Sequence, residues 1–129
     1  MTTIVVGVTN HTTALAACHR AFELARPGDQ IHLVSAVDGR GEEAATAHRH
    51  ADGLLETLQL SSNRPVTVHT VHGEPHQAIL EVAERTKADL IVIGNKGMVR
   101  NGRFTRAAPA RVLRGANCSV LVVDTRHAG

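Results

Sequence analysis

The segment from Gly94 to Arg106 contains the residues best suited to binding a phosphate group. It holds three glycines and four cationic side chains, those of Lys96, Arg100, Arg103 and Arg106. Backbone N–H groups in a glycine-rich turn attract anions, and so does the positive end of a following helix. The segment therefore suggests a phosphate-bearing ligand. The alternative is that the glycines serve tight turns and the cations form a solvated surface.

The spacing of this segment excludes two common phosphate-binding motifs. A Walker A loop needs a Gly-Lys-Ser/Thr sequence at a fixed distance from its first glycine, and the segment lacks it. A dinucleotide fingerprint follows the first strand of its domain, whereas this segment comes late in the chain. Any phosphate site here belongs to another class.

The nine histidines raise the question of metal binding. His69, His72 and His76 lie near the end of one predicted strand, whereas His48 and His50 lie on a predicted helix. Helical residues two positions apart point about 200° away from each other, so the helical pair does not chelate one ion. The other three have no carboxylate or cysteine at ligand spacing. We expect surface histidines and no metal site.

Residues for catalysis are sparse. His11, in a turn after the first strand, suits either phosphate contact or general-base chemistry, but no serine or cysteine partner lies nearby. Asp38, after the second strand, fits a pocket-facing residue and a turn residue equally well, and Asp89 reads as a solvated or turn residue. Cys18 falls on the apolar side of a predicted helix. We therefore expect no catalytic residues and no enzymatic activity.

The elements that position these residues are five short strands rich in valine, isoleucine and leucine. The predicted strands are Ile4–Val8, Ile31–Val37, Val66–Val71, Leu90–Ile93 and Val120–Val123. The third alternates apolar and polar residues, which is typical of a half-exposed strand at the edge of a sheet.

Helical patterns separate the strands. The predicted helices run from a cap at Thr12 or Thr13 through Leu24, from about Glu42 to Leu58, from Pro75 through Ala83, and from about Ala107 to Arg114. The patterns place Leu24 and Leu113 on inward faces. Strict alternation of strands and helices predicts one α/β domain over residues 1–129, a doubly wound parallel sheet with helices on both faces. Ligands of such sheets bind at the carboxyl ends of the strands.

The composition supports this architecture and excludes several functions. Apolar residues make up 43% of the chain and aromatic residues 2%, so the core consists of aliphatic side chains. The net charge of +2 and the lack of aromatics argue against nucleic-acid binding. Two distant cysteines, no signal peptide and no apolar run long enough to span a bilayer predict a cytoplasmic protein without membrane contact.

Several segments resemble the universal stress protein family. They are the Val71-His72-Gly73-Glu74-Pro75 entry to the third helix, Ala88 to Gly94 before the long loop, and Ala116 to Val123 at the last strand. The resemblance covers essentially the whole chain. It implies a Rossmann-like sheet of the adenine nucleotide alpha hydrolase type with strand order 3-2-1-4-5, and a role in stress response.

The resemblance also implies an adenine-nucleotide site. Its positions in this chain are Thr9, Ala36, Ile93, Gly94, Gly97, Arg106, Ala107 and Ala108. Thr9 stands where ATP-binding relatives have an aspartate, and Ala107-Ala108 stands where they have a glycine and a hydroxyl residue. Loss of one charged hydrogen bond costs about 1.5–3 kcal/mol, so we expect weak or absent ATP binding.

Two functions follow from these departures. In the first, the protein acts through protein interaction, meeting an unidentified partner through its dimer surface or through the Gly94–Arg106 segment. In the alternative, it is a regulatory module that binds ATP, AMP or cyclic AMP. Slow ATP hydrolysis, implied by the family in general, stays open as a minor activity.

The last strand suggests an interface. Val120, Leu121, Val122 and Val123 form a continuous apolar run, and an unprotected apolar edge invites pairing with another chain. The resemblance implies a homodimer in which this strand pairs across a twofold axis. A monomer with a covered edge is the alternative.

Overall fold

The computed structural model describes residues 2–8, 11–37, 49, 53, 56, 66–94, 99–100, 103–104 and 108–123. For residues 8, 11–15, 37, 99–100, 103–104 and 108–110 it describes the backbone alone. The helix predicted from Glu42 to Leu58 falls outside these ranges except for Arg49, Gly53 and Glu56, which are helical.

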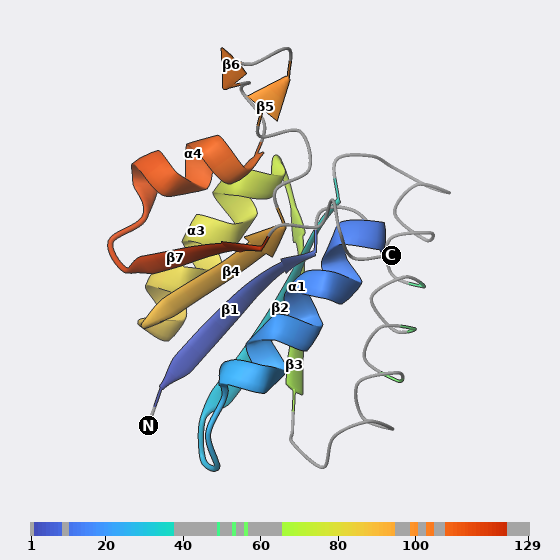
Figure 1. The fold of residues 1–129 in the computed structure, drawn as a ribbon, viewed down its shortest axis with the longest axis vertical. Coiled ribbons are helices and arrows are strands. Elements are labelled where there is room, and N and C mark those ends of the chain that lie inside the picture. Colours follow the sequence, from blue (N-terminus) through green and yellow to red (C-terminus); the bar gives the residue numbers. More distant parts are fainter. Residues whose placement is uncertain are drawn as a thin grey trace.

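A five-stranded parallel sheet forms the centre of the molecule, in the order β3-β2-β1-β4-β7 (Figure 1). Its strands are β1 (Thr3–Val8), β2 (Gln30–Val37), β3 (Val66–His72), β4 (Leu90–Gly94) and β7 (Ser119–Val123). All four ladders between them are parallel. Since β7 is the fifth strand of this sheet, the order 3-2-1-4-5 is confirmed, as is the edge position of β3.

Three helices with described bounds pack on the two faces: α1 (His11–Leu24), α3 (Pro75–Thr86) and α4 (Ala108–Gly115). Figure 1 shows α1 on one face of the sheet and α3 with α4 on the other. Because α1 already begins at His11, Thr12 and Thr13 lie inside the helix, so the predicted cap is wrong and His11 is not a turn residue.

The third helix follows the predicted signals closely. Pro75 occupies its first turn, where a missing N–H costs nothing. At the other end Lys87 adopts a left-handed conformation with φ of 54°, and its N–H donates to the carbonyls of Ala83 and Glu84. This cap ends the helix and directs the chain into β4.

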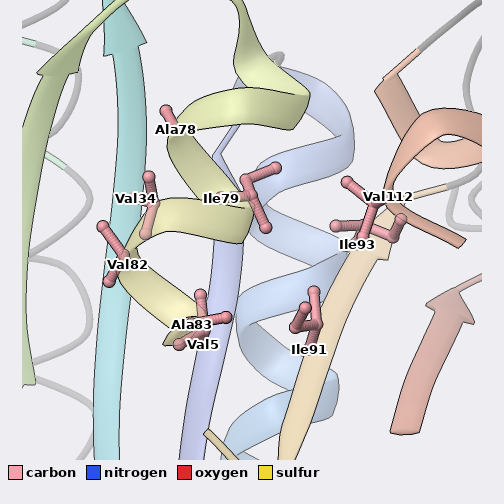
Figure 2. Close-up of a cluster of buried hydrophobic side chains, with 9 residues drawn as sticks. All are labelled: Val5, Val34, Ala78, Ile79, Val82, Ala83, Ile91, Ile93 and Val112. Atoms are coloured by element: carbon pink, nitrogen blue, oxygen red, sulfur yellow. The ribbon is translucent and has the colours of Figure 1, made fainter. Parts of the chain in front are cut away.

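Alternate residues along the central strands supply two separate hydrophobic clusters. Under α1, Ile4 and Val6 of β1 pack against Ala17, Cys18 and Ala21. The cluster under α3 and α4, drawn in Figure 2, comprises Val5, Val34, Ala78, Ile79, Val82, Ala83, Ile91, Ile93 and Val112. Small alanines on the helices and branched residues on the strands allow close approach, so the aliphatic core predicted from the composition is confirmed.

Two leucines predicted to face inward are exposed. Leu24 is the last residue of α1, and Leu113 follows the fully buried Val112 in the short helix α4; each is 42% exposed. At a helix end, or on a helix of eight residues, only the central inward position reaches the sheet.

The segment after β4 contains a small hairpin that the sequence interpretation missed. Strands β5 (Val99–Arg100) and β6 (Arg103–Phe104) pair antiparallel, with Arg100 opposite Arg103. The residues between them in the sequence are Asn101-Gly102, the dipeptide that most favours a two-residue hairpin connection. The sequence interpretation assigned no strands to this segment because this signal was overlooked.

Two aspartates hold the start of β1. The N–H of Thr2 donates to Asp29 Oδ1 at 2.8 Å, and the N–H of Thr3 donates to Asp89 Oδ2 at 2.9 Å. Asp89 thus does more than precede a strand, because its carboxylate joins the first residues of β1 to the entry of β4. No described helix is long and apolar enough to cross a membrane.

Candidate functional site

The order in which successive strands are added to the sheet reverses between β1 and β4. From β1 the chain proceeds to β2 and then to β3 at one edge, after which α3 returns it to β4 on the other side of β1. Ligands of open α/β sheets bind beside such a reversal, at the carboxyl ends of the strands. The candidate site therefore lies next to Val8 and Gly94, where the arrowheads of β1 and β4 lie side by side (Figure 1).

Two of the predicted site residues, Ala36 and Ile93, belong to the same face of the sheet. Both pack in the cluster under α3 and α4, Ala36 half-buried and Ile93 only 2% exposed. Figure 2 shows the Ile93 side chain turned toward Val112 of α4. The side chain of Ile93 therefore serves packing, and only its backbone and that of buried Gly94 are left for a ligand at the strand end.

Gly7 is a residue of this region that the sequence interpretation did not single out. A Cβ atom at Gly7 would lie 2.5 Å from Ile79 Cδ1 and 2.9 Å from Ile93 Cγ2. The missing side chain lets α3 approach the sheet one residue before β1 ends. A glycine inside an otherwise β-branched strand is the signal that would have identified it.

Other predicted positions fall outside the part of the chain that is described. They are Thr9, Gly97, Arg106 and Ala107. Ala108 is the first residue of α4, described for its backbone only. Since α4 leads from the carboxyl end of β4 back to the start of β7, its N-terminus belongs to the candidate end of the sheet.

An ion pair joins α4 to the N-terminus of α3 near this end. Arg111 Nη1 lies 2.9 Å from Glu74 Oε2, and His76 Nδ1 lies 3.3 Å from the same oxygen. The Glu74 side chain is 51% exposed, so the pair contributes at most about 1 kcal/mol. Its effect is to hold the first turns of α3 and α4 together beside the site, a role that sequence spacing alone did not reveal.

The structure rearranges the predicted histidine grouping. His76 contacts Glu74, whereas His69 pairs with His32 of the neighbouring strand, their facing ring nitrogens 2.9 Å apart. Burial lowers the pKa of both paired histidines, and for His69 the charges of His32 and Arg85 lower it further. Among the described residues no three His, Cys, Asp or Glu side chains gather as a metal set.

The cysteines occupy different surroundings. Cys18 is fully buried, which confirms its assignment to the core, and this burial raises the pKa of its thiol to about 12. Cys118 is half-buried, and its pKa is raised by burial and by the charge of Asp89.

Cys118 also lines a cavity of about 280 Å³ at the amino end of the sheet. The remaining lining residues are Leu80, Ala83, Glu84, Lys87, Ala88, Ile91, Gly115, Ala116 and Asn117. None of the predicted site residues belongs to this cavity, so it is distinct from the candidate site.

The strand order, the helices on both faces and the reversal beside β1 define a doubly wound α/β protein of the kind that binds ligands at its strand ends. Residues 1–124 match the Universal stress protein family. The chain belongs to that family, as its sequence motifs predicted.

Individual relatives agree with this assignment. Universal stress protein Rv1636 of Mycobacterium tuberculosis (strain ATCC 25618 / H37Rv) is 29% identical over 140 residues, covering 95% of this chain and 96% of the relative. A solved universal stress protein in complex with cAMP is 25% identical with a TM-score of 0.78, covering 96% of this chain and 97% of that one. A universal stress protein from Archaeoglobus fulgidus, 18% identical with a TM-score of 0.72 over 95% of this chain and 97% of that one, shares the fold.

Proposed function

We propose that the carboxyl end of the sheet binds cyclic AMP, and that the protein acts in stress response by binding this nucleotide rather than by turnover. The observation that carries the proposal is the likeness, over 96% of this chain, to a universal stress protein solved in complex with cAMP. An adenine nucleotide was the alternative reading of the sequence, and a single-phosphate nucleotide reconciles it with the departures from the ATP pattern.

The described backbone supports a small anionic ligand at this place. Only two residues separate the end of β1 at Val8 from the start of α1 at His11. The N-terminus of α1 therefore lies next to the strand end, where its N–H groups favour a phosphate. Buried Gly94 ends the neighbouring β4 without a side chain to fill the space above it.

The sequence departures weigh against ATP more than against a cyclic nucleotide. In a cyclic nucleotide the 3′ oxygen belongs to the phosphate ring, so no ribose diol remains for a carboxylate to accept from. Having threonine instead of aspartate at position 9 therefore costs a cyclic nucleotide fewer ribose hydrogen bonds than it costs ATP. Likewise, alanines at 107 and 108 give up contacts to a polyphosphate that a single phosphate does not need.

Calorimetric titration of the full chain with cAMP, AMP and ATP tests this proposal. We expect cAMP to bind at least about tenfold more tightly than ATP, a difference of about 1.4 kcal/mol. Thr9→Asp should narrow or reverse this preference, because it restores a ribose acceptor. Thr67→Asp is the matched control, since Thr67 is exposed on β3 away from the strand ends. No heat with any nucleotide, or tighter binding of ATP, would overturn the proposal.

A second proposal concerns assembly. We infer that β7 pairs with β7 of a second copy, because its four apolar residues from Val120 to Val123 are only half-buried at the edge of the sheet. Light scattering at micromolar concentration should give twice the chain mass. Leu121→Lys should give a monomer, and circular dichroism checks that it is folded, because Leu121 also packs against the cluster under α1. Thr67→Lys on the opposite edge should remain dimeric. A monomeric mass for the unmodified protein would contradict this inference.

A further inference from the structure

A pair of histidines lies apart from the nucleotide site, on the two strands at the other side of the sheet. His32 of β2 and His69 of β3 face each other with His32 Nδ1 2.9 Å from His69 Nε2. Their ring centroids are 5.1 Å apart and their planes differ by 35°. In the strand register Val34 lies opposite His69, so His32, two residues before Val34, is the diagonal neighbour of His69. Both histidines lie on the face of the sheet that α3 covers.

The separation of the two nitrogens matches the bite of a metal chelate. Metal–imidazole bonds of about 2.0–2.1 Å place two nitrogens 2.9 Å apart when the angle at the metal is about 90°. That is the angle between neighbouring ligands in square-planar or octahedral coordination. A tetrahedral zinc site would need about 3.3 Å between the nitrogens, so the rings of this hydrogen-bonded pair would have to move less for Ni²⁺ or Cu²⁺ than for Zn²⁺.

The protonation state of the pair also suits metal binding. The 2.9 Å contact requires one of the two facing nitrogens to be without a proton, so at least one ring is in the neutral form that ligates metals. The proton now shared between Nδ1 of His32 and Nε2 of His69 has to leave the facing nitrogens. With the Nε2–H of His32 directed at Gln30 Oε1, the shared proton belongs to His69 Nε2, and it moves to Nδ1 of the same ring through solvent, so binding releases no net proton. Gln30 Oε1, 3.5 Å from His32 Nε2, is placed as the outer partner of a metal-bound imidazole.

We propose that His32 and His69 form a two-histidine site for Ni²⁺ or Cu²⁺, with water completing the coordination. Among the described residues no third His, Cys, Asp or Glu joins them, so the site presents open positions to solvent. Arg85 of α3 lies near enough for its charge to act on His69, and the same charge opposes a bound cation. The site is independent of the nucleotide proposal, because both histidines lie away from the strand ends of β1 and β4.

Titration of the metal-free full chain with NiCl₂ in a calorimeter tests the site. We expect one ion per chain, and we expect His32→Asn and His69→Asn each to weaken its binding at least about tenfold. His72→Asn is the control, because His72 is an exposed histidine of the same strand. Circular dichroism checks that each variant is folded. Equal Ni²⁺ affinity in the unmodified protein and in either pair variant would show binding elsewhere and overturn the proposal.

A second variant tests the site without touching its ligands. Arg85→Gln removes the neighbouring positive charge, and should tighten Ni²⁺ binding severalfold. An unchanged affinity would place the ion away from His69 and contradict the proposal. Zn²⁺ titration adds a geometric test, since Zn²⁺ binding more tightly than Ni²⁺ would contradict the 90° assignment.

Discussion

The central strands of the sheet and the edge strand β7 have similar sequences but different surroundings. In β1 and β4 the side chains of Val5, Val6, Ile91 and Val92 are completely buried. Strand β7, with the sequence SVLVV, is as apolar as β4, yet its residues are only half-buried. Apolar composition therefore does not decide burial here. The position of a strand in the order does, because an edge strand has a neighbour on one side only.

The two edges also differ from each other. In β3, threonines and histidines are interspersed with valines, and the polar side chains make contacts of their own, including the His32–His69 pair. In β7 four apolar residues follow one another, and among the described residues no strand pairs with the outer side of β7. Polar residues discourage pairing at an edge and continuous apolar residues invite it. This contrast is why we propose β7, and not β3, as the surface for assembly.

The two cysteines give the largest test of the contrast between centre and edge. A small disulfide reagent at pH 8 should modify half-buried Cys118 at least about 100-fold faster than buried Cys18, because Cys18 reacts only when the fold opens. The reaction is followed by absorbance of the released thiolate. Cys118→Ser should remove the fast phase and Cys18→Ser the slow one. Similar rates for both thiols would show that the centre is as accessible as the edge.

Matched valine-to-alanine substitutions in a central strand and in an edge strand express the same contrast as differences in the free energy of unfolding. Val92→Ala in β4 removes two buried methyl groups and should lower the free energy of unfolding by about 2–3 kcal/mol. Val120→Ala in β7 removes the same groups from a half-buried position and should cost about 1 kcal/mol in the monomer. Urea denaturation at equilibrium provides both values. A loss for Val120→Ala as large as that for Val92→Ala, at concentrations where the protein is monomeric, would contradict the distinction.

Gly7 tests how tightly the centre is packed. Gly7→Ala places a methyl group against Ile79 and Ile93 and should destabilise the protein by about 1–3 kcal/mol. Gly53→Ala is a useful control, since a Cβ at Gly53 meets nothing within 4 Å. Thermal unfolding of the two variants gives the comparison. Equal melting temperatures would mean that α3 moves away from the sheet without cost.

The effect that is smallest near neutral pH is a pH dependence arising from Cys18, which develops only above about pH 9. Its pKa is raised to about 12 by burial, whereas the thiol in the unfolded chain titrates near 9.0. Between these values the unfolded chain binds fewer protons, so the stability contributed by the neutral thiol is complete below pH 9.0 and falls as the pH rises further. In that range the free energy of unfolding should fall by up to about 1.4 kcal/mol per pH unit. Urea midpoints at increasing pH should show a shallower fall for Cys18→Ala than for Cys118→Ala.

The sequence predicted most of the fold because its signals are local. Short β-branched runs bounded by turn residues located all five strands of the sheet, and Pro75 located the start of α3. Helix ends were less predictable. Helix α1 begins only two residues after β1 ends. The helical periodicity places Leu24 and Leu113 on the side that faces the sheet, but both are exposed because the helix does not cover the sheet at these positions.

The candidate site was predictable in location but not in detail. Strand order alone directs attention to the ends of β1 and β4, and Gly94 is placed there as expected. Contacts that depend on register between strands or on packing between helices have no sequence signature. The His32–His69 pair spans 37 positions, and so does the Glu74–Arg111 pair. The closeness of Gly7 to Ile79 likewise requires the docked α3.

The place of β1 in the sheet has a consequence for the order of assembly during synthesis. This strand is made before the others, and β2 pairs with one of its sides soon afterwards. Its other side finds its partner only when residues 90–94 emerge, and the carboxylate of Asp89 that binds the Thr3 N–H arrives at the same moment. A nascent or truncated chain that lacks β4 therefore presents an open apolar strand from its centre. We expect such fragments to associate through that edge and to need protection by chaperones until translation passes residue 94.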